Sequence, residues 1–314
     1  MTVDIADIEA ARERIAGKVR HTPVIPLGQL KNPPPTDARV SLKLESLQVT
    51  GSFKARGAMN RLLATPAGQV AKGIVTASGG NHGLAVARTA YAAGVPATIF
   101  VPSGVSPEKV AKMRAWEAKV EVVGDEWTQS NKAALDLVAG TGAIYFHPFA
   151  DPLVIAGQGT LGLEILDDLP DIDAILIAIG GGGLIAGMST AIRARRPGIR
   201  IVGVEPTGAP TLKACLDAGR LVELPEVTSR VPTMTCRKTE EINYEIVQRN
   251  VDDIVLVTDE EMEAASRWLW FEMGIAADLS GAAAMAALNK GVAGLEGMKH
   301  ICVLVCGAGA EGTV

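Results

Sequence analysis

The alternation of short apolar runs with amphipathic segments from residue 70 onward constrains the fold of this chain more than any other feature. The runs are rich in Val and Ile, and they cover residues 73–78, 97–102, 119–124, 143–149, 173–180, 199–206, 252–258 and 300–306. Intervening segments such as 107–118 and 259–273 have the apolar spacing of helices. Continuous apolar strands that alternate with such helices indicate an α/β fold, in which parallel, twisted sheets are covered by helices on both faces.

The number of strands indicates two lobes. With the additional run 40–48, the chain has more strand candidates than one compact doubly wound sheet usually needs in 314 residues. Ligands of such folds bind at the carboxyl ends of the strands. We therefore expect a site where these ends meet.

Composition and charge exclude several function classes. The net charge of -5 disfavours a nucleic-acid partner. The uncharged stretch 174–192 contains four consecutive glycines, so a strand–loop–helix unit explains it better than a membrane span. The N-terminal segment has acids among its apolar residues, unlike a signal peptide. Four cysteines without a C-x-x-C pair predict neither disulfides nor a zinc site, and they favour a cytoplasmic location.

The segment "TGSFKARGA" (50–58) places a lysine in an unusual position. Gly51 and Ser52 predict a turn and a helix N-cap, and apolar residues three or four apart predict a helix, at Ala55, Ala58, Met59, Leu62 and Leu63. Lys54 then falls in the first turn, where the helix dipole disfavours a cation by ~0.3–1 kcal/mol. This segment alone is compatible with a functional lysine and with a solvated surface lysine.

A glycine quartet, Gly180–Gly183, ends one strand and opens a helix. Backbone amides at such a turn can converge on an anion such as phosphate. Alternatively, the glycines only permit close packing of the helix on the sheet. A third interpretation is a dinucleotide site of an NAD-dependent dehydrogenase. Gly181, Gly183 and Ala186 match G-x-G-x-x-G/A, and Glu205 ends the next strand.

A second loop, "SGGNHG" (78–83), also joins a strand to a helix. Its backbone amides, with the side chains of Ser78 and Asn81, could hold an anion the size of a carboxylate. The alternative is a simple helix start punctuated by glycine. His82 alone is more often a structural histidine than a catalyst.

Four motifs together resemble one enzyme family. They are "GSFKARGA" (51–58), "SGGNHG" (78–83), "GGGG" (180–183) and "VCGAGAEG" (305–312), and their order and spacing fit fold-type-II pyridoxal-phosphate (PLP) enzymes. These enzymes share a tryptophan synthase β-like fold, and the threonine/serine dehydratase and serine racemase group is the most similar. The resemblance implies a large cofactor-binding domain, 1–68 plus 149–314, a small substrate-side domain, 69–148, and a homodimer.

The resemblance also implies a role for each motif. Lys54 would form the Schiff base with pyridoxal 5'-phosphate, which requires a neutral amine. The cofactor would be contacted through its phosphate by Gly180, Gly181, Gly182 and Gly183, through its ring by Phe53, through its 3-oxygen by Asn81 and near its pyridine nitrogen by Cys306. The carboxylate of a small amino-acid substrate would be held by Ser78, Gly79, Asn81 and His82. A neutral thiol at Cys306 would make the ring a weaker electron sink than an acidic partner would.

Within this group, the residues favour an ammonia-lyase that acts on L-threonine or L-serine. Ala55 after the lysine resembles the dehydratases. Racemases carry a serine where this chain has Gly79, which disfavours racemisation. Arg230 replaces an acid of the relatives and would suit a threo-3-hydroxyaspartate dehydratase if it faced the site. A serine racemase, an NAD-dependent dehydrogenase and a non-catalytic ligand-binding protein remain as alternatives.

Two positions leave questions for the structure. The family's divalent-cation site would use Glu205 and the backbone oxygen of Ala209, but Thr211 stands where relatives have a second acid. Because one of the expected ligands is missing, the sequence does not predict a bound metal. Asp278 stands where relatives often have Glu, and the sequence assigns it no role.

Overall fold

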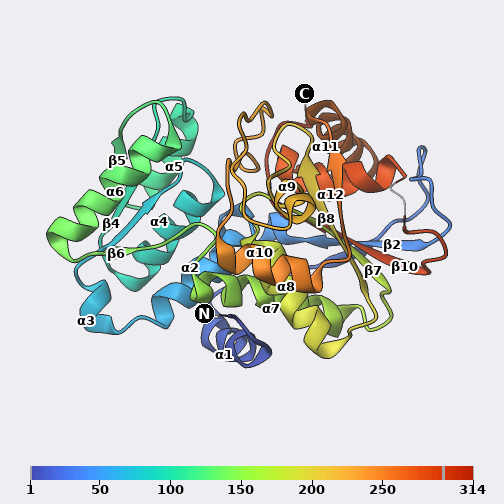
Figure 1. The fold of residues 1–314 in the computed structure, drawn as a ribbon, viewed down its shortest axis with the longest axis horizontal. Coiled ribbons are helices and arrows are strands. Elements are labelled where there is room, and N and C mark those ends of the chain that lie inside the picture. The colour runs from blue at the N-terminus through green and yellow to red at the C-terminus, as the bar shows by residue number, and fades with distance from the viewer. Residues whose placement is uncertain (1, 292–293, 314) are drawn as a thin grey trace.

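The chain forms two lobes, each built around its own sheet (Figure 1). The computed structural model describes residues 2–291 and 294–313. The N-terminal helix lies under the larger lobe, and the smaller lobe is formed by a continuous central part of the chain (Figure 1). The expected two-lobed α/β architecture is therefore confirmed.

The larger sheet has the strand order β1-β2-β10-β7-β8-β9. Its strands are β1 (Val24–Pro26), β2 (Arg39–Leu44), β10 (His300–Val305), β7 (Ala174–Ala178), β8 (Arg200–Pro206) and β9 (Asp253–Val257). All neighbours are parallel except β1, which pairs antiparallel with β2 at the edge. The sequence patterns do not predict β1, because a three-residue strand that ends in proline carries no periodicity.

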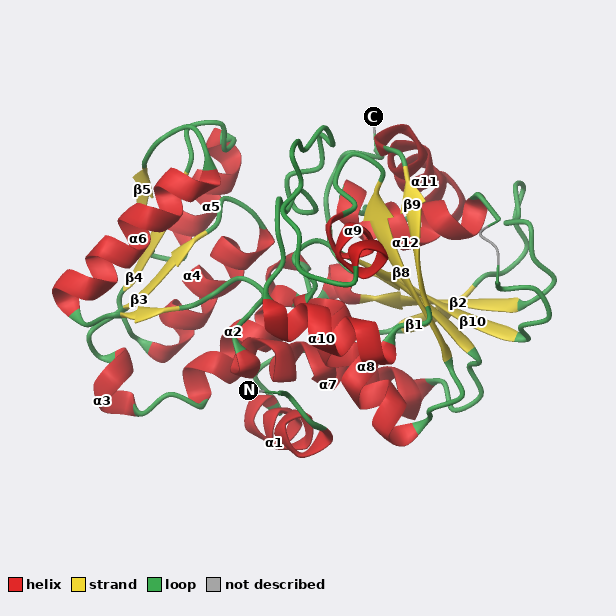
Figure 2. Cartoon of the chain, in the orientation of Figure 1, coloured by secondary structure: helices red, strands yellow, loops and turns green. Residues whose placement is uncertain are grey.

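Helices cover both faces of this sheet (Figure 2). One side carries α1 (Ile5–Ile15), α2 (Lys54–Leu63), α7 (Pro152–Asp168), α8 (Gly183–Arg195) and α10 (Glu241–Asn250). The other side carries α11 (Asp259–Met273) and α12 (Leu279–Asn289), whereas α9 (Thr211–Ala218) begins near the carboxyl end of β8 and contacts α10. Residues 174–192 form β7 and α8, as expected, and no helix in the described part of the chain is long and apolar enough to cross a bilayer.

The smaller sheet is parallel throughout and has the order β5-β4-β3-β6. Its strands are β3 (Ile74–Ala77), β4 (Ala97–Val101), β5 (Lys119–Val122) and β6 (Ile144–Tyr145), and its helices are α3 (Ala67–Val70), α4 (Asn81–Ala93), α5 (Pro107–Ala115) and α6 (Trp127–Thr141). The predicted strand 143–149 is shorter than expected. After Tyr145 the chain leaves the sheet and runs to the start of α7 in the larger lobe.

The start of α2 differs from the prediction by one residue. The N-cap is Phe53, without a side-chain cap, whereas Ser52 is extended and pairs with Gly307 in an isolated bridge. The amide of Phe53 donates to the carbonyl of Cys306 at 3.3 Å. Pairing with the segment after β10 thus keeps Ser52 out of the helix and places Lys54 beside Cys306. The predicted apolar face is buried apart from Leu63, which is 40% exposed.

Candidate active site

Residues of both lobes line one large cavity of about 810 Å³. The smaller lobe contributes the 78–82 loop at the end of β3, and the larger lobe contributes the glycine loop at the end of β7. Lys54 and Cys306 also line it. The structure therefore brings together all the site residues predicted from the four motifs, at the carboxyl ends of strands from two sheets.

Lys54 lies at the wall of this cavity with its amine directed to the segment that joins the lobes. Its Nζ donates to the carbonyl of Pro148 at 2.7 Å and lies 5.1 Å from the centre of the Phe53 ring. Burial lowers the pKa of Lys54 from 10.5 to about 8, against a smaller opposing effect of Cys236 and Cys306. From the sequence, we expected the helix dipole to disfavour the charge on Lys54. In the structure, the main cause is the loss of solvent around the amine.

The geometry of the glycine loop is compatible with both its packing interpretation and its anion-binding interpretation. A methyl group on Gly181 would come within 2.3 Å of the Phe149 ring, and one on Gly183 would come within 2.4 Å of the Phe149 carbonyl. Gly182, the N-cap of α8, has a φ of 94°. Close packing thus requires the glycines. The amides of residues 180–184 also donate to no group in the described parts of the chain, so they are available to an anion.

The 78–82 loop also has backbone amides without hydrogen-bond partners among the described residues. Gly80 is the N-cap of α4 without a side-chain cap, and the amides of Gly79, Asn81 and His82 have no hydrogen-bond partner among the described residues. The His82 Nε2 lies 3.1 Å from the carbonyl of Phe146. Burial lowers the pKa of His82 to about 3, so its imidazole is neutral. Its side chain thus anchors the loop to the backbone of Phe146.

Cys306 and Asp278 lie together at the start of α12. The Cys306 Sγ lies 3.4 Å from the carbonyl of Ser280, and burial raises the pKa of this thiol, so it is neutral. Asp278 is the N-cap of α12. Its carboxylate accepts hydrogen bonds from the amide of Gly281 and from the Nδ2 of Asn81, the latter at 2.9 Å. The structure thus gives Asp278 a role in positioning Asn81.

The residues of the candidate cation site do not fit a divalent metal. The two carboxylate oxygens of Glu205 accept hydrogen bonds from the backbone amides of Leu212 and Lys213, at 2.8 and 2.9 Å. Thr211 donates its hydroxyl to the carbonyl of Cys236. Burial raises the pKa of Glu205 to about 7. A single carboxylate whose oxygens both cap a helix lacks the second acid that a divalent-cation site would need.

Arg230 does not face the cavity. Its side chain is 63% exposed and forms ion pairs on the surface with Asp259, Glu260 and Glu263 of α11. The condition that favoured a threo-3-hydroxyaspartate dehydratase is therefore not met.

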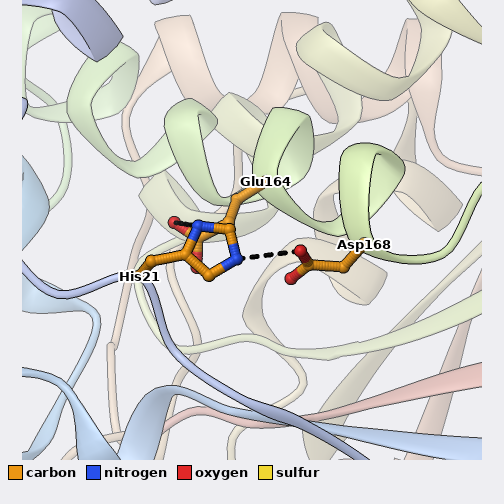
Figure 3. A group of neighbouring side chains, drawn as sticks. All are labelled: His21, Glu164 and Asp168. Carbon is orange, nitrogen blue, oxygen red and sulfur yellow. Dashed lines mark hydrogen bonds and ion pairs between the residues drawn. The ribbon is translucent and has the colours of Figure 1, made fainter.

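A second group of potential ligands lies outside the cavity. His21, Glu164 and Asp168 come within 4.8 Å of one another (Figure 3). The Nζ of Lys43 lies 2.7 Å from a carboxylate oxygen of Glu164 and also of Asp168. Because Lys43 pairs with both acids and Arg56 also pairs with Glu164, the cluster is a structural ion-pair network.

Sequence reasoning missed three residues around the glycine loop: Phe149, Thr239 and Asn243. Phe149 packs against the loop, and the other two donate hydrogen bonds to the carbonyl of Gly181. None belongs to a motif that marks a site. Asn243 offers only one signal, which is a polar side chain on the buried face of α10.

This cavity, lined by a lysine of lowered pKa and by two loops with unpaired backbone amides in the described residues, is typical of an enzyme that binds a phosphorylated cofactor. The chain belongs to the family of pyridoxal-phosphate-dependent enzymes, whose model matches residues 15–307. It is 40% identical to the L-threonine ammonia-lyase of Geobacter sulfurreducens, across 95% of this chain and 73% of the relative. It is 36% identical to the phenylserine dehydratase of Ralstonia pickettii, across 98% and 94% of the two chains.

Solved structures agree with the family. Maize serine racemase superposes with a TM-score of 0.92 at 31% identity, covering 98% of this chain and 94% of the racemase. Threonine deaminase isoform 2 of tomato, Solanum lycopersicum, superposes with a TM-score of 0.88 at 30% identity, covering 98% of this chain and 87% of the tomato enzyme. The fold type, the PLP cofactor and the assignment to the PLP-dependent lyases of the threonine ammonia-lyase type, all predicted from the motifs, are thereby confirmed.

Proposed function

We propose that this enzyme is a hydroxy-amino-acid ammonia-lyase that converts L-threonine or L-serine to a 2-oxo acid and ammonia. The observation that carries the proposal is the buried Lys54 amine, whose pKa is lowered to about 8 in a cavity with two amide-lined anion sites. The similarity to threonine ammonia-lyases supports the choice of substrate.

The proposed site assigns one role to each part of the cavity. Lys54 would bond the cofactor aldehyde, and the amides of Gly180–Gly183 would bind its phosphate. Phe53 and Asn81 would contact the ring and its 3-oxygen, and Cys306 would lie at the pyridine nitrogen. The substrate carboxylate would be bound by Ser78, Gly79, Asn81 and His82, mainly through backbone amides.

When bound, PLP supplies a ring that withdraws electrons from the substrate's Cα. The residues of this chain supply the remaining steps. The Lys54 amine would act as the base that removes the Cα proton, and its pKa of about 8 leaves a fraction of it unprotonated near neutral pH. The amides of the 78–82 loop hold the carboxylate so that Cα stays within reach of this base. Elimination of the β-hydroxyl as water, followed by hydrolysis, gives the oxo acid and ammonia.

The surroundings of Gly79 favour elimination over racemisation. A methyl group on Gly79 would come within 2.1 Å of the Val105 Cγ2, so an apolar side chain fills the space that a serine would need. Val105 cannot carry a proton. The similarity to serine racemases keeps racemase activity as the second candidate, and chiral analysis of the amino acid left after turnover tests it.

Three broader assignments belong to the same proposal. We assign residues 1–68 and 149–314 to a large cofactor-binding domain and 69–148 to a small substrate-side domain. The strands of the smaller sheet, which run from Ile74 to Tyr145, support this division. A homodimer in the cytoplasm completes the proposal, by resemblance to the family.

The test uses Lys54→Ala beside Lys109→Ala. Lys109 lines the same cavity but is exposed, so it is a matched control. Wild type and Lys109→Ala should bind PLP with a yellow colour and form oxo acid from L-Thr or L-Ser, whereas Lys54→Ala should do neither. Full activity in Lys54→Ala, or turnover of threo-3-hydroxyaspartate with none of L-Thr or L-Ser, would contradict the proposal.

A further inference from the structure

We propose that Thr239 and Asn243 are positioning residues that hold the glycine loop in its phosphate-binding shape. This inference rests on the proposed assignment of Gly180–Gly183 to the cofactor phosphate. Both side chains are almost fully buried, with 3% and 0% of their surface exposed. They lie at the start of α10, outside the four motifs.

The two side chains converge on one backbone atom. The carbonyl oxygen of Gly181 accepts hydrogen bonds from the Thr239 Oγ1 at 3.0 Å and from the Asn243 Nδ2 at 2.8 Å. In a trans peptide, the C=O and the following N–H lie in one plane and point in opposite directions. Fixing the Gly181 carbonyl toward α10 therefore directs the Gly182 amide away from α10, to the side where an anion can bind.

This restraint is needed because the loop is made of glycine. Four consecutive glycines have more backbone freedom than any other sequence, and Gly182 has a φ of 94° that few residues tolerate. An anion that had to order such a loop would bind more weakly than one that meets a preformed cup. Two buried hydrogen bonds to the middle of the loop reduce this ordering cost.

Asn243 also ties the loop to the segment between the lobes. Its Nδ2 lies 3.2 Å from the carbonyl of Phe149, whose ring packs against Gly181. The preceding residue, Pro148, accepts the hydrogen bond from Lys54. The Oδ1 of Asn243 is buried without a partner in the described structure. Because an unpaired buried acceptor lowers stability, the donor side of this amide accounts for its presence.

The experiment compares Thr239→Val with Thr239→Ser by titrating the cofactor-free protein with PLP and with pyridoxal, which lacks the phosphate. Valine keeps the shape of threonine but removes the donor, whereas serine keeps the donor. We expect the Kd for PLP to rise about tenfold in Thr239→Val, as for loss of one hydrogen bond, and to change less than about twofold in Thr239→Ser. The Kd for pyridoxal should not change in either variant.

Asn243→Ala removes a donor shared by two carbonyls, so its Kd for PLP should rise more than that of Thr239→Val. The melting temperature of each cofactor-free variant shows whether the fold is intact. An unchanged Kd for PLP in Thr239→Val, or an equal rise for PLP and pyridoxal, would overturn the inference. If wild type bound pyridoxal as tightly as PLP, the phosphate assignment itself would be wrong, which separates this failure from that of the positioning role.

Discussion

At the scale of single residues, the site combines an amine that loses its charge easily with a thiol that does not acquire one. Burial lowers the pKa of Lys54 to about 8 and raises that of Cys306. Both shifts follow from the same cause, because removal of solvent disfavours whichever form is charged. The cavity thus contains an amine that is mostly neutral above about pH 8 and a thiol that stays neutral.

The reaction of the cofactor-free protein with PLP should report the pKa of Lys54. Only the neutral amine attacks an aldehyde, so the rate of covalent attachment should rise as the pH increases through about 8 and then level off. Stopped-flow absorbance between about pH 6 and 10 measures this rate. A midpoint near that of a free lysine, about 10.4, would show that burial does not act on this amine.

At the scale of elements, glycines decide how closely the helices approach. Where α7 and α8 cross, a methyl group on Gly187 would come within 2.2 Å of the Ile155 carbonyl and 2.6 Å of the Gly159 amide. The backbones of the two helices are therefore in direct contact. The resulting packing fixes α8, and with it the glycine loop at its N-terminus.

Gly187→Ala should destabilise the protein by about 1–3 kcal/mol through overpacking. Helix propensity alone predicts the opposite sign, a gain of about 1 kcal/mol. Gly140→Ala in α6 is the matched control, because a methyl group there meets nothing within 4 Å. Chemical denaturation of both variants measures the effect. A Gly187→Ala protein as stable as Gly140→Ala would show that the helices do not pack this closely in solution.

At the scale of the whole molecule, buried charges join the sheet of the larger lobe to its helices. The Arg56 guanidinium on α2 pairs with Glu45, which follows β2, at 2.6 Å and with Glu164 of α7 at 2.9 Å. Lys43 of β2 reaches Glu164 and Asp168. Because α2 begins with Lys54, this network also fixes the helix that carries the reactive amine.

Arg56→Met should cost about 3–5 kcal/mol in the free energy of unfolding, because it leaves the buried Glu45 carboxylate without its cationic partner. Lys132→Ala is the control. It breaks an exposed pair with Asp136 on α6 and should cost no more than about 0.5 kcal/mol. Urea denaturation compares the two. A loss for Arg56→Met as small as that of the control would mean that solvent reaches this network and screens it.

The sequence by itself determined the elements and the motifs, because both depend on short-range patterns. The apolar runs located all but one of the strands, and the motifs identified the family and predicted a site that includes Lys54 and the glycine quartet. The prediction of the α2 N-cap was wrong, because pairing between distant segments decides the conformation of Ser52. Ser52 joins a bridge to Gly307 and does not cap α2.

The tertiary structure alone decided the pKa values, the orientations and the hydrogen-bond partners of individual side chains. Burial lowers the pKa of Lys54, surface acids on α11 hold Arg230 away from the cavity, and helix amides occupy the Glu205 carboxylate. Asn243 meets the glycine loop across more than sixty residues of chain. Solvent exclusion and contacts between distant segments depend on how elements pack, and no local pattern encodes them.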